Sequence, residues 1–292
     1  MRTPNYVGRL VLLTATLVTL ISLHEGRAQS LDFPPLDVSR MGIEVMKGNF
    51  EDVEGISTIS SIWYFDIQEP LPSGEFAFIF EVPMAIYDEK DFQSVFGPIT
   101  FDAQIMIGNP LVAMEFRSSG NGLGGYGWFG IRPPIVSEDN DDAQLYGLLT
   151  DFDRLDAFLT NYVSILGGGG WRGELSKSAD GSIQFHFGLS GLELLATENY
   201  VESEFFLKYH AQFWYIMSQF SYYIGYNGVA LVSDGDLDLG ERTESQLTLG
   251  VRGNFGQVSP GAFIRFPLEK DLNDILSFVG GVNLLINLPG TQ

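Results

Sequence analysis

Apolar and polar side chains alternate strictly in several long stretches of the chain. In "SIQFHFGLSG", residues 182–191, Ile183, Phe185 and Phe187 share one parity, and Gln184 and His186 fall on the other. Since side chains alternate between the two faces of a strand, this pattern predicts a strand with one apolar and one polar face. The apolar face must look either at a protein core or at lipid.

The same alternation recurs along the chain, as in "EFAFIFEVPM" and "YVESEFFLKYHAQFWY", and predicts about twelve strands. Most of them exceed the ~5–6 residues usual in soluble sheets and reach the ~9–11 residues that a membrane-spanning strand needs. The expected spans are 40–50, 56–68, 74–86, 103–117, 123–133, 163–176, 182–196, 200–215, 219–232, 243–254, 257–267 and 275–288.

The connections between these strands alternate in length. If the N-terminus lies on the periplasmic side, every second connection is short: "EPLPSG", "SSGNG", "KSADGS", "MSQ" and "NFGQ". Four of the six connections on the other side are long, among them the stretch that begins at Pro134. Short turns at one end and long loops at the other are typical of outer-membrane barrels.

The number of strands and the alternation of short and long connections together predict an all-β fold, a transmembrane antiparallel up-and-down β-barrel with its apolar face towards lipid. A closed barrel satisfies every backbone N–H and C=O without water, as hydrocarbon requires. The alternative is a soluble β-sandwich or a lipocalin-like barrel with the apolar face inside, but a lipocalin has ~8 strands.

One segment, residues 143–166, breaks the strand pattern. Its apolar residues recur at spacings of three and four, which predicts an amphipathic helix begun by the acidic run "SEDNDD". The helix falls in an outer loop; we favour packing on the barrel rim over a plug folded into the lumen. The apolar positions are Leu145, Leu148, Leu149, Phe152, Leu155, Leu159, Tyr162 and Leu166.

The first 28 residues read as a signal peptide, with a basic start, the apolar stretch "LVLLTATLVTLISL" and small residues at Gly26 and Ala28. We expect cleavage rather than retention as an anchor, so residues 1–28 are the signal peptide and residues 29–292 form the barrel domain. Removing three arginines and one glutamate changes the net charge from −21 to −23.

The composition narrows the function classes. A strongly acidic chain argues against a nucleic-acid partner and against an anionic membrane surface. The chain contains no Cys, which excludes thiolate catalysis, redox disulfides and zinc–thiolate sites. Abundant Phe, Tyr and Gly (23, 12 and 34 residues) suit an exported β protein, and we expect it in the outer membrane of a Gram-negative-type bacterium.

The stretch "IGNPLVAMEFR" resembles the phenol meta-pathway group of outer-membrane channels, which are relatives of hydrophobic-compound transporters. Gly108, Asn109 and Pro110 match the group's Gly-Asp/Asn-Pro followed by a small, apolar strand. The resemblance implies a β-barrel channel or transporter. The chain departs from related barrels in two ways: it ends "NLPGTQ" rather than in an aromatic residue, and residues 29–40 are too few for an N-terminal plug domain.

A twelve-strand barrel is wider than the ~8-strand barrels that side chains can fill, so the sequence favours a lumen for small solutes. Its ionisable lining is either a selectivity filter, with carboxylates favouring cations, or a network of internal salt bridges. The residues expected inside are Glu81, Glu115, Arg172, Glu174, His186, Glu202, Glu204, Lys208, His210, Glu244, Arg252 and Arg265.

The sequence also bears on cation binding and on catalysis. In the outer loop "SDGDLDLGE", Asp234, Asp236, Asp238 and Glu241 alternate and are candidate ligands for Ca²⁺; the alternative is a solvated acidic loop. Catalysis is not expected, because His186 and Ser190 share a strand face roughly 13 Å apart, too far for a nucleophile and its base.

The sequence therefore predicts a non-enzymatic outer-membrane channel or transporter for small solutes, with hydrophobic compounds as one candidate class. The alternative is a non-transport barrel that acts structurally or binds a partner through its acidic outer loops. The other partner expected is outer-membrane lipid.

Overall fold

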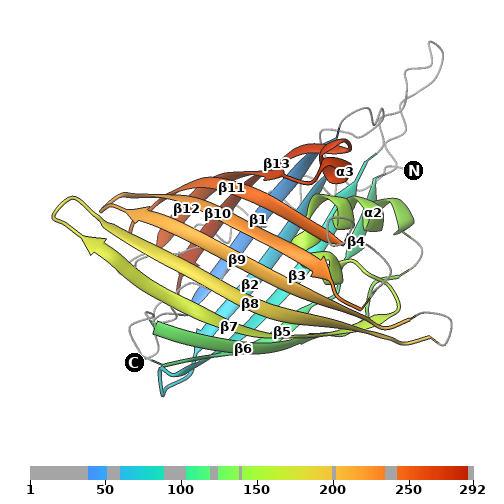
Figure 1. Cartoon of the computed structure of the whole chain (residues 1–292), viewed down its shortest axis with the longest axis horizontal. Coiled ribbons are helices and arrows are strands. Elements are labelled where there is room, and N and C mark those ends of the chain that lie inside the picture. Colours follow the sequence, from blue (N-terminus) through green and yellow to red (C-terminus); the bar gives the residue numbers. More distant parts are fainter. Residues whose placement is uncertain are drawn as a thin grey trace, which may run out of the picture.

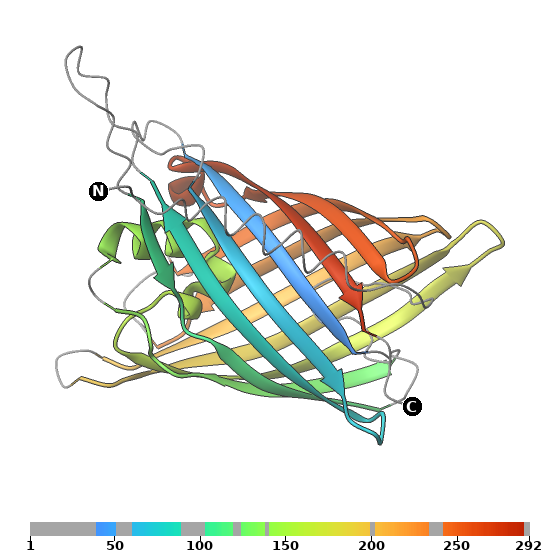
Figure 2. The same ribbon diagram turned by 180° about the vertical axis from the view of Figure 1, so that it is seen from behind.

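The computed structural model describes residues 39–50, 60–88, 103–118, 124–137, 140–198, 202–233 and 242–288. Within these ranges, antiparallel strands follow one another around a single sheet that closes where β1 pairs with both β13 and β2. Figure 1 shows the barrel from the side, and Figure 2 shows the closure, with blue β1 between red β13 and teal β2. The strands are β1 (Arg40–Phe50), β2 (Ser61–Pro70), β3 (Phe76–Tyr87), β4 (Gln104–Ile107), β5 (Leu111–Arg117), β6 (Gly124–Arg132), β7 (Tyr162–Lys177), β8 (Ser182–Ala196), β9 (Glu204–Ile216), β10 (Phe220–Leu231), β11 (Thr243–Gly253), β12 (Val258–Pro267) and β13 (Leu276–Asn287).

The thirteen strand elements of the described ranges make twelve barrel strands, because β4 and β5 are two parts of one strand and both pair with β3. The interruption falls at Gly108, Asn109 and Pro110. The predicted fold class and strand number are therefore confirmed, and the predicted strand 103–117 is broken in its middle.

The two ends of the barrel differ as the connection lengths predict. At one end, here called the short-turn end, β2–β3, β7–β8, β9–β10 and β11–β12 are joined by tight turns. Gly74 and Gly256, with φ of +69° and +68°, supply left-handed backbone in two of these turns. The other end, here called the long-loop end, carries α2 (Asp141–Thr150), the 3-10 helix η2 (Phe152–Ala157) and α3 (Lys270–Asn273). Within the described ranges, no helix combines the length and apolar character needed to cross a bilayer.

The apolar parity of the strands faces outward. Phe187, Leu189 and Phe213 are 50%, 54% and 51% exposed, whereas His186, the neighbour of Phe187 on the opposite face, is 6% exposed. Large exposed apolar side chains on a closed sheet have no protein partner, and lipid is the solvent that suits them. Phe205 and Leu249 also lie on this outer surface.

An arginine on this outer face tests its contact with lipid. Leu189→Arg, near the middle of β8, is expected to destabilise the barrel folded in a bilayer by about 2–4 kcal/mol, because a cation then lies near the bilayer midplane. Glu193→Arg is the matched control, since Glu193 shares the strand and face but stands exposed nearer the long-loop end. Urea titration of the barrel refolded into vesicles measures both, and equal losses would contradict a lipid-facing Leu189.

The inside of the barrel is apolar at the long-loop end. Inward side chains of the wall pack there against α2 and the turn after η2, and Phe158 at their centre is fully buried. Gly147 of α2 lies against the Phe158 ring, where an added Cβ would approach to 2.6 Å. The wall contributes Met46, Ile62, Tyr64, Ala85, Met106, Val229, Phe263, Leu276 and Val279, and the loop contributes Ala143, Tyr146, Phe152, Ala157 and Phe158.

The predicted rim position of the loop helix holds only for α2, which lies at the long-loop mouth with one face exposed, because the next helical segment, η2, extends into the barrel. The predicted apolar stripe is wrong: Leu145 is 56% exposed, while the buried positions of α2 are Ala143, Tyr146, Gly147 and Thr150. Small residues and one tyrosine allow the helix to approach the wall closely. The helical pattern also ends earlier than 166, because the chain kinks at Asp151 and β7 begins at Tyr162.

Candidate functional site

The segment that folds into the barrel, residues 140–161, is here called the inward segment. Below its apolar layer, η2 carries charged side chains into the middle of the lumen. Arg154 lies at the centre of this layer, with its guanidinium 3.4 Å from the Tyr64 ring centroid. Its nitrogens pair with Asp151 at 2.7 Å, with Glu81 at 3.3 Å and with Glu44. One side chain thus joins η2 to β1, β2 and β3.

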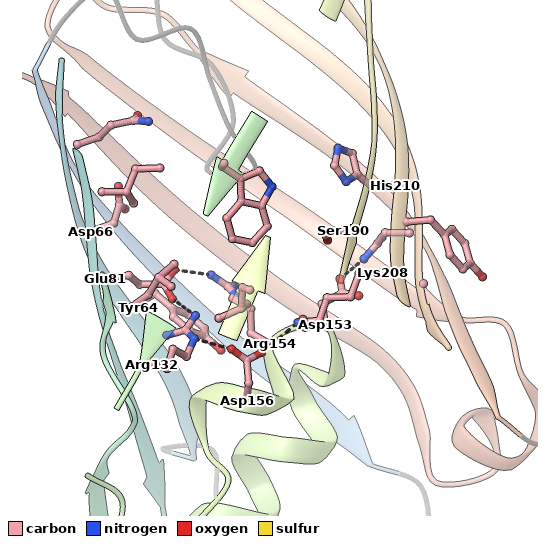
Figure 3. A pocket seen from close by; sticks show the side chains of 18 of the residues that line it. Tyr64, Asp66, Glu81, Arg132, Asp153, Arg154, Asp156, Ser190, Lys208 and His210 are labelled. Carbon is pink, nitrogen blue, oxygen red and sulfur yellow. Dashed lines mark hydrogen bonds and ion pairs between the residues drawn. The ribbon is translucent and has the colours of Figure 1, made fainter. Parts of the chain in front are cut away.

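Asp156 faces the opposite part of the wall. The fully buried carboxylate accepts hydrogen bonds from Arg132 Nε at 2.7 Å and from Lys208 Nζ at 3.0 Å. Arg132 also donates to Glu81 at 2.6 Å. Asp156 therefore links η2 to β6 and β9, and the shared Glu81 couples it to Arg154 (Figure 3).

The remaining acidic residues of η2 and its start complete the bridge across the lumen. Asp151 accepts a hydrogen bond from Arg265 on β12 at 3.1 Å. Asp153 accepts hydrogen bonds from Asn227 on β10 and Gln246 on β11. The inward segment is therefore held by polar contacts to strands on all sides of the barrel rather than to one wall.

Burial alone would raise the pKa of both Asp151 and Asp156, because it penalises the charged form. The adjacent cations outweigh it. Arg154 and Arg265 hold the pKa of Asp151 below its usual value, and Lys208 and Arg132 do the same for Asp156. Both groups are thus carboxylates at neutral pH, and the ion pairs are fully formed.

Asn109, in the strand interruption, anchors the C-terminal part of the inward segment and the stretch of chain that precedes the segment. Its Nδ2 donates to the carbonyls of Asp156 and Leu159 at 3.1 and 2.7 Å, and its Oδ1 accepts from the backbone N–H groups of Ile135 and Val136 at 2.8 and 3.1 Å. Its own N–H donates to the Ala157 carbonyl at 2.7 Å.

Gly108 makes this anchoring approach possible. A Cβ there would stand 2.4 Å from the Ala157 carbonyl oxygen. The Gly-Asn-Pro motif that carried the family resemblance therefore interrupts a barrel strand so that the wall can hold the inward segment.

A cavity of about 160 Å³ remains beside the charged layer. Most of the residues that line it are polar or charged, although apolar atoms contribute the larger part of its surface. Figure 3 shows Lys208, His210 and Ser190 on one side of it and Asp66 and Glu81 on the other. Apolar contributions come from Ile79, Leu111, Trp128 and Leu166.

A second polar layer lies towards the short-turn end. The buried Glu115 accepts two hydrogen bonds of 3.2 Å from Arg172, and Arg117 Nε lies 3.7 Å from it. Across the barrel, Arg252 donates to Asn283 at 3.2 Å. The inward side chains of this layer carry four arginines and two carboxylates among the described residues: Arg40, Arg117, Arg172, Arg252, Asp66 and Glu115.

The structure brings most residues predicted for the lumen to the inner wall, and most are paired there. Two lie elsewhere: Glu202 is exposed and precedes β9, and Glu174 is exposed near the short-turn end of β7. Glu204 and Glu244 are half-buried at the long-loop ends of β9 and β11. The predicted lumen residues that do lie in the two polar layers or beside the cavity are Glu81, Glu115, Arg172, His186, Lys208, His210, Arg252 and Arg265.

Sequence reasoning missed the role of the acidic residues of η2, which lie outside the apolar positions that the pattern of residues 143–166 singles out. The predicted cation ligands Asp234, Asp236, Asp238 and Glu241 lie outside the described residues. Ser190 lies opposite Lys208 in the β8–β9 register, and Gly188 is the residue opposite His210.

A closed antiparallel barrel with an apolar exterior and a charged interior defines an outer-membrane β-barrel. Comparisons with solved structures agree with this class. An outer membrane channel from Pseudomonas putida F1 superposes with a TM-score of 0.57 at 10% identity, covering 90% of this chain and 100% of its own. LpxR from Salmonella typhimurium superposes with a TM-score of 0.53 at 9% identity, covering 85% of this chain and 100% of its own.

No protein-family model matches the chain, and no curated protein matches it either. At 9–10% identity the structural likeness shows the fold alone. The sequence resemblance to outer-membrane channels is confirmed at that level, as architecture.

Proposed function

We propose that this protein is a gated outer-membrane channel for small solutes, held closed by its inward segment. The observation that carries the proposal is the set of ion pairs and hydrogen bonds from Asp151, Asp153, Arg154 and Asp156 to strands around the whole barrel. A twelve-strand barrel is too wide for wall side chains alone to fill, and here the inward segment, which these contacts tie to the wall, completes the filling.

The character of the contacts favours a gate over a permanent core. In a lumen that water can enter, both members of an ion pair can exchange each other for water at a modest net cost in free energy. Loss of only one partner is much more costly, because the other charge stays buried and unpaired. The inward segment therefore has two accessible arrangements, folded in or released, with the ion pairs deciding between them.

The solute class follows from the cavity. A space of about 160 Å³, lined by charged side chains such as Arg132, Lys208 and Asp153 and by apolar surface, suits a small molecule that bears polar or charged groups together with an apolar part. A purely hydrophobic compound would displace water from those charged side chains without replacing its hydrogen bonds, which costs free energy. We therefore favour small polar solutes over the hydrophobic compounds considered from the sequence, and a non-enzymatic role.

The second candidate is a barrel that does not transport, in which the inward segment is permanent. The apolar layer around Phe158 favours it, because releasing that side chain exposes a ring that is fully buried. Flux measurements separate the two. In planar bilayers, refolded wild-type protein is expected to show rare, discrete openings from a closed baseline. Silence of both the wild type and the gate variant Asp156→Asn would favour the second candidate.

Cysteine labelling tests the lumen without a conductance measurement. The chain has no Cys, so Ser190→Cys introduces a single thiol beside the cavity. A small water-soluble thiol reagent is expected to modify it slowly, at a rate that rises at least tenfold (~1.4 kcal/mol) when Asp156→Asn is added. The control Leu189→Cys points into lipid and is expected to resist the reagent in both backgrounds. Equal rates at the two positions would contradict a water-filled lumen.

A further inference from the structure

Three atoms of metal-binding types, two imidazole nitrogens and one phenol oxygen, meet on the inner wall, outside the network of the inward segment. His186 Nε2 lies 2.7 Å from Tyr126 Oη. His210 Nε2 lies 3.2 Å from Tyr126 Oη and 3.2 Å from His186 Nε2. The two imidazoles belong to β8 and β9 and the phenol to β6, so three strands converge on one point.

The wall is shaped to allow this convergence. In the strand registers, Tyr126 lies opposite Gly170, Gly170 opposite Gly188, and Gly188 opposite His210. The two glycines lie between the tyrosine and the histidine, and their missing side chains let the phenol reach across β7 and β8. A Cβ on Gly170 would stand 2.6 Å from Tyr126 Oη, and one on Gly188 would stand 2.5 Å from it and 2.8 Å from His210 Nε2.

Hydrogen bonding accounts for only some of the three contacts among Tyr126 Oη, His186 Nε2 and His210 Nε2. A neutral imidazole Nε2 is either one donor or one acceptor, and the phenol has a single proton. If His186 Nε2 accepts that proton, it has no second lone pair for His210 Nε2. At most two of the three contacts are therefore hydrogen bonds at one time, whereas a cation among the three atoms uses a lone pair from each.

We propose that Tyr126, His186 and His210 form a binding site for a late first-row transition-metal ion. Atoms separated by 2.7, 3.2 and 3.2 Å lie about 1.8 Å from their common centre. An ion ~2.0 Å from each then stands about 1 Å above their plane, as in a tetrahedral site. Two imidazoles with a phenolate select Zn²⁺ or Cu²⁺ over Ca²⁺ or Mg²⁺.

The surroundings support such a site. Gln212 lies opposite His186 and hydrogen-bonds its ring, which fixes the ring's orientation. The guanidinium of Arg172 is 4.2 Å from the Tyr126 ring centroid, but its charge is offset by Glu115. His210 lines the cavity, so the fourth coordination position opens towards the lumen. Within the described ranges, no three His, Cys, Asp or Glu side chains gather for a metal; here the tyrosine supplies the third donor.

The test is binding of the metal alone to the tag-free, refolded full chain in detergent. Competition with a chromophoric chelator is expected to show one Zn²⁺ per barrel, and His186→Gln or His210→Gln is expected to weaken its binding at least tenfold. With Cu²⁺, a phenolate-to-copper absorption band is expected, which Tyr126→Phe removes. The matched control is Tyr223→Phe, since Tyr223 also faces the lumen but stacks on Trp214, and it is expected to keep both the band and the Zn²⁺ affinity.

Wild-type Zn²⁺ affinity no greater than that of the double variant His186→Gln/His210→Gln would overturn the proposal. If the variants fail to fold, judged by heat-dependent mobility on gels, the wild type still decides: its Cu²⁺ complex must show nitrogen hyperfine coupling from two imidazoles and the phenolate band, and absence of either overturns the site. These readouts need no solute flux, so their outcome is separate from that of the channel proposal.

Discussion

Asp156→Asn is expected to convert rare openings into a predominantly open channel. The substitution keeps the size of the side chain but removes the charge that Arg132 and Lys208 share. Removing one partner of a buried ion pair costs about 3 kcal/mol or more. The cost falls on the folded-in arrangement, because a released segment leaves all these groups to water. The ratio of open to closed states is therefore expected to rise on the order of 100-fold, measured as open probability in planar bilayers.

Asp274→Asn is the matched control for this change. Asp274 also pairs with a lysine, Lys270, but the pair is exposed at the long-loop end and such pairs contribute little. Its open probability is expected to equal that of the wild type. Larger currents from Asp274→Asn, or unchanged currents from Asp156→Asn in a correctly folded barrel, would show that the inward segment is not the gate.

The fold was predictable because the lipid boundary imposes a strict pattern. Alternation such as that of Phe185, His186 and Phe187 depends only on which face of the strand meets lipid, and it extends across the whole membrane thickness. Turn chemistry at Gly74 and Gly256 is equally local. These signals need no knowledge of what fills the barrel.

The interior was only partly predictable, because it depends on contacts between distant segments. Polar parity does place Glu81, Lys208 and Arg265 inside the barrel. It does not show that residues 140–161 fold in to meet them, since Asp153 and Asp156 have the composition of a solvated helix face. The apolar inward residues near η2, such as Leu192 and Leu194, also contradict the simple rule of polar inside and apolar outside. They are buried by the loop, and the rule assumes an empty, wet lumen.

One sequence signal pointed to the interior without revealing its role. Gly108, Asn109 and Pro110 were noticed through a family resemblance, yet the physical need for them appears only when Asn109 is seen to bond both Leu159 of the inward segment and Ile135 before it. The convergence of Tyr126 on His186 and His210 is similar. Two glycines in neighbouring strands carry it, and the register that aligns them cannot be read from spacing alone.

Acid is expected to open the channel, but only well below neutrality. The ion pairs of Asp151 and Asp156 lower the pKa of each carboxyl in the folded-in arrangement below 3.8, its ordinary value and the one expected after release. For a lowered pKa, the stabilisation is fully present above the released value and is lost as the pH falls through the folded-in value. Open probability is therefore expected to stay constant from about pH 7 to pH 5 and to rise steeply below 3.8, because the partners Arg132, Arg154, Lys208 and Arg265 keep their charge throughout.

The double variant Asp151→Asn/Asp156→Asn provides the control for this acid response. It lacks both titrating carboxylates, so its open probability is expected to be high at every pH and to change little below 3.8. The strands that form the barrel must remain folded through the titration, which heat-dependent gel mobility verifies at each pH. Opening of the wild type between pH 7 and pH 5 would instead show that a group other than Asp151 and Asp156 holds the gate. The pH at which current appears therefore tests whether these two carboxylates keep the channel closed.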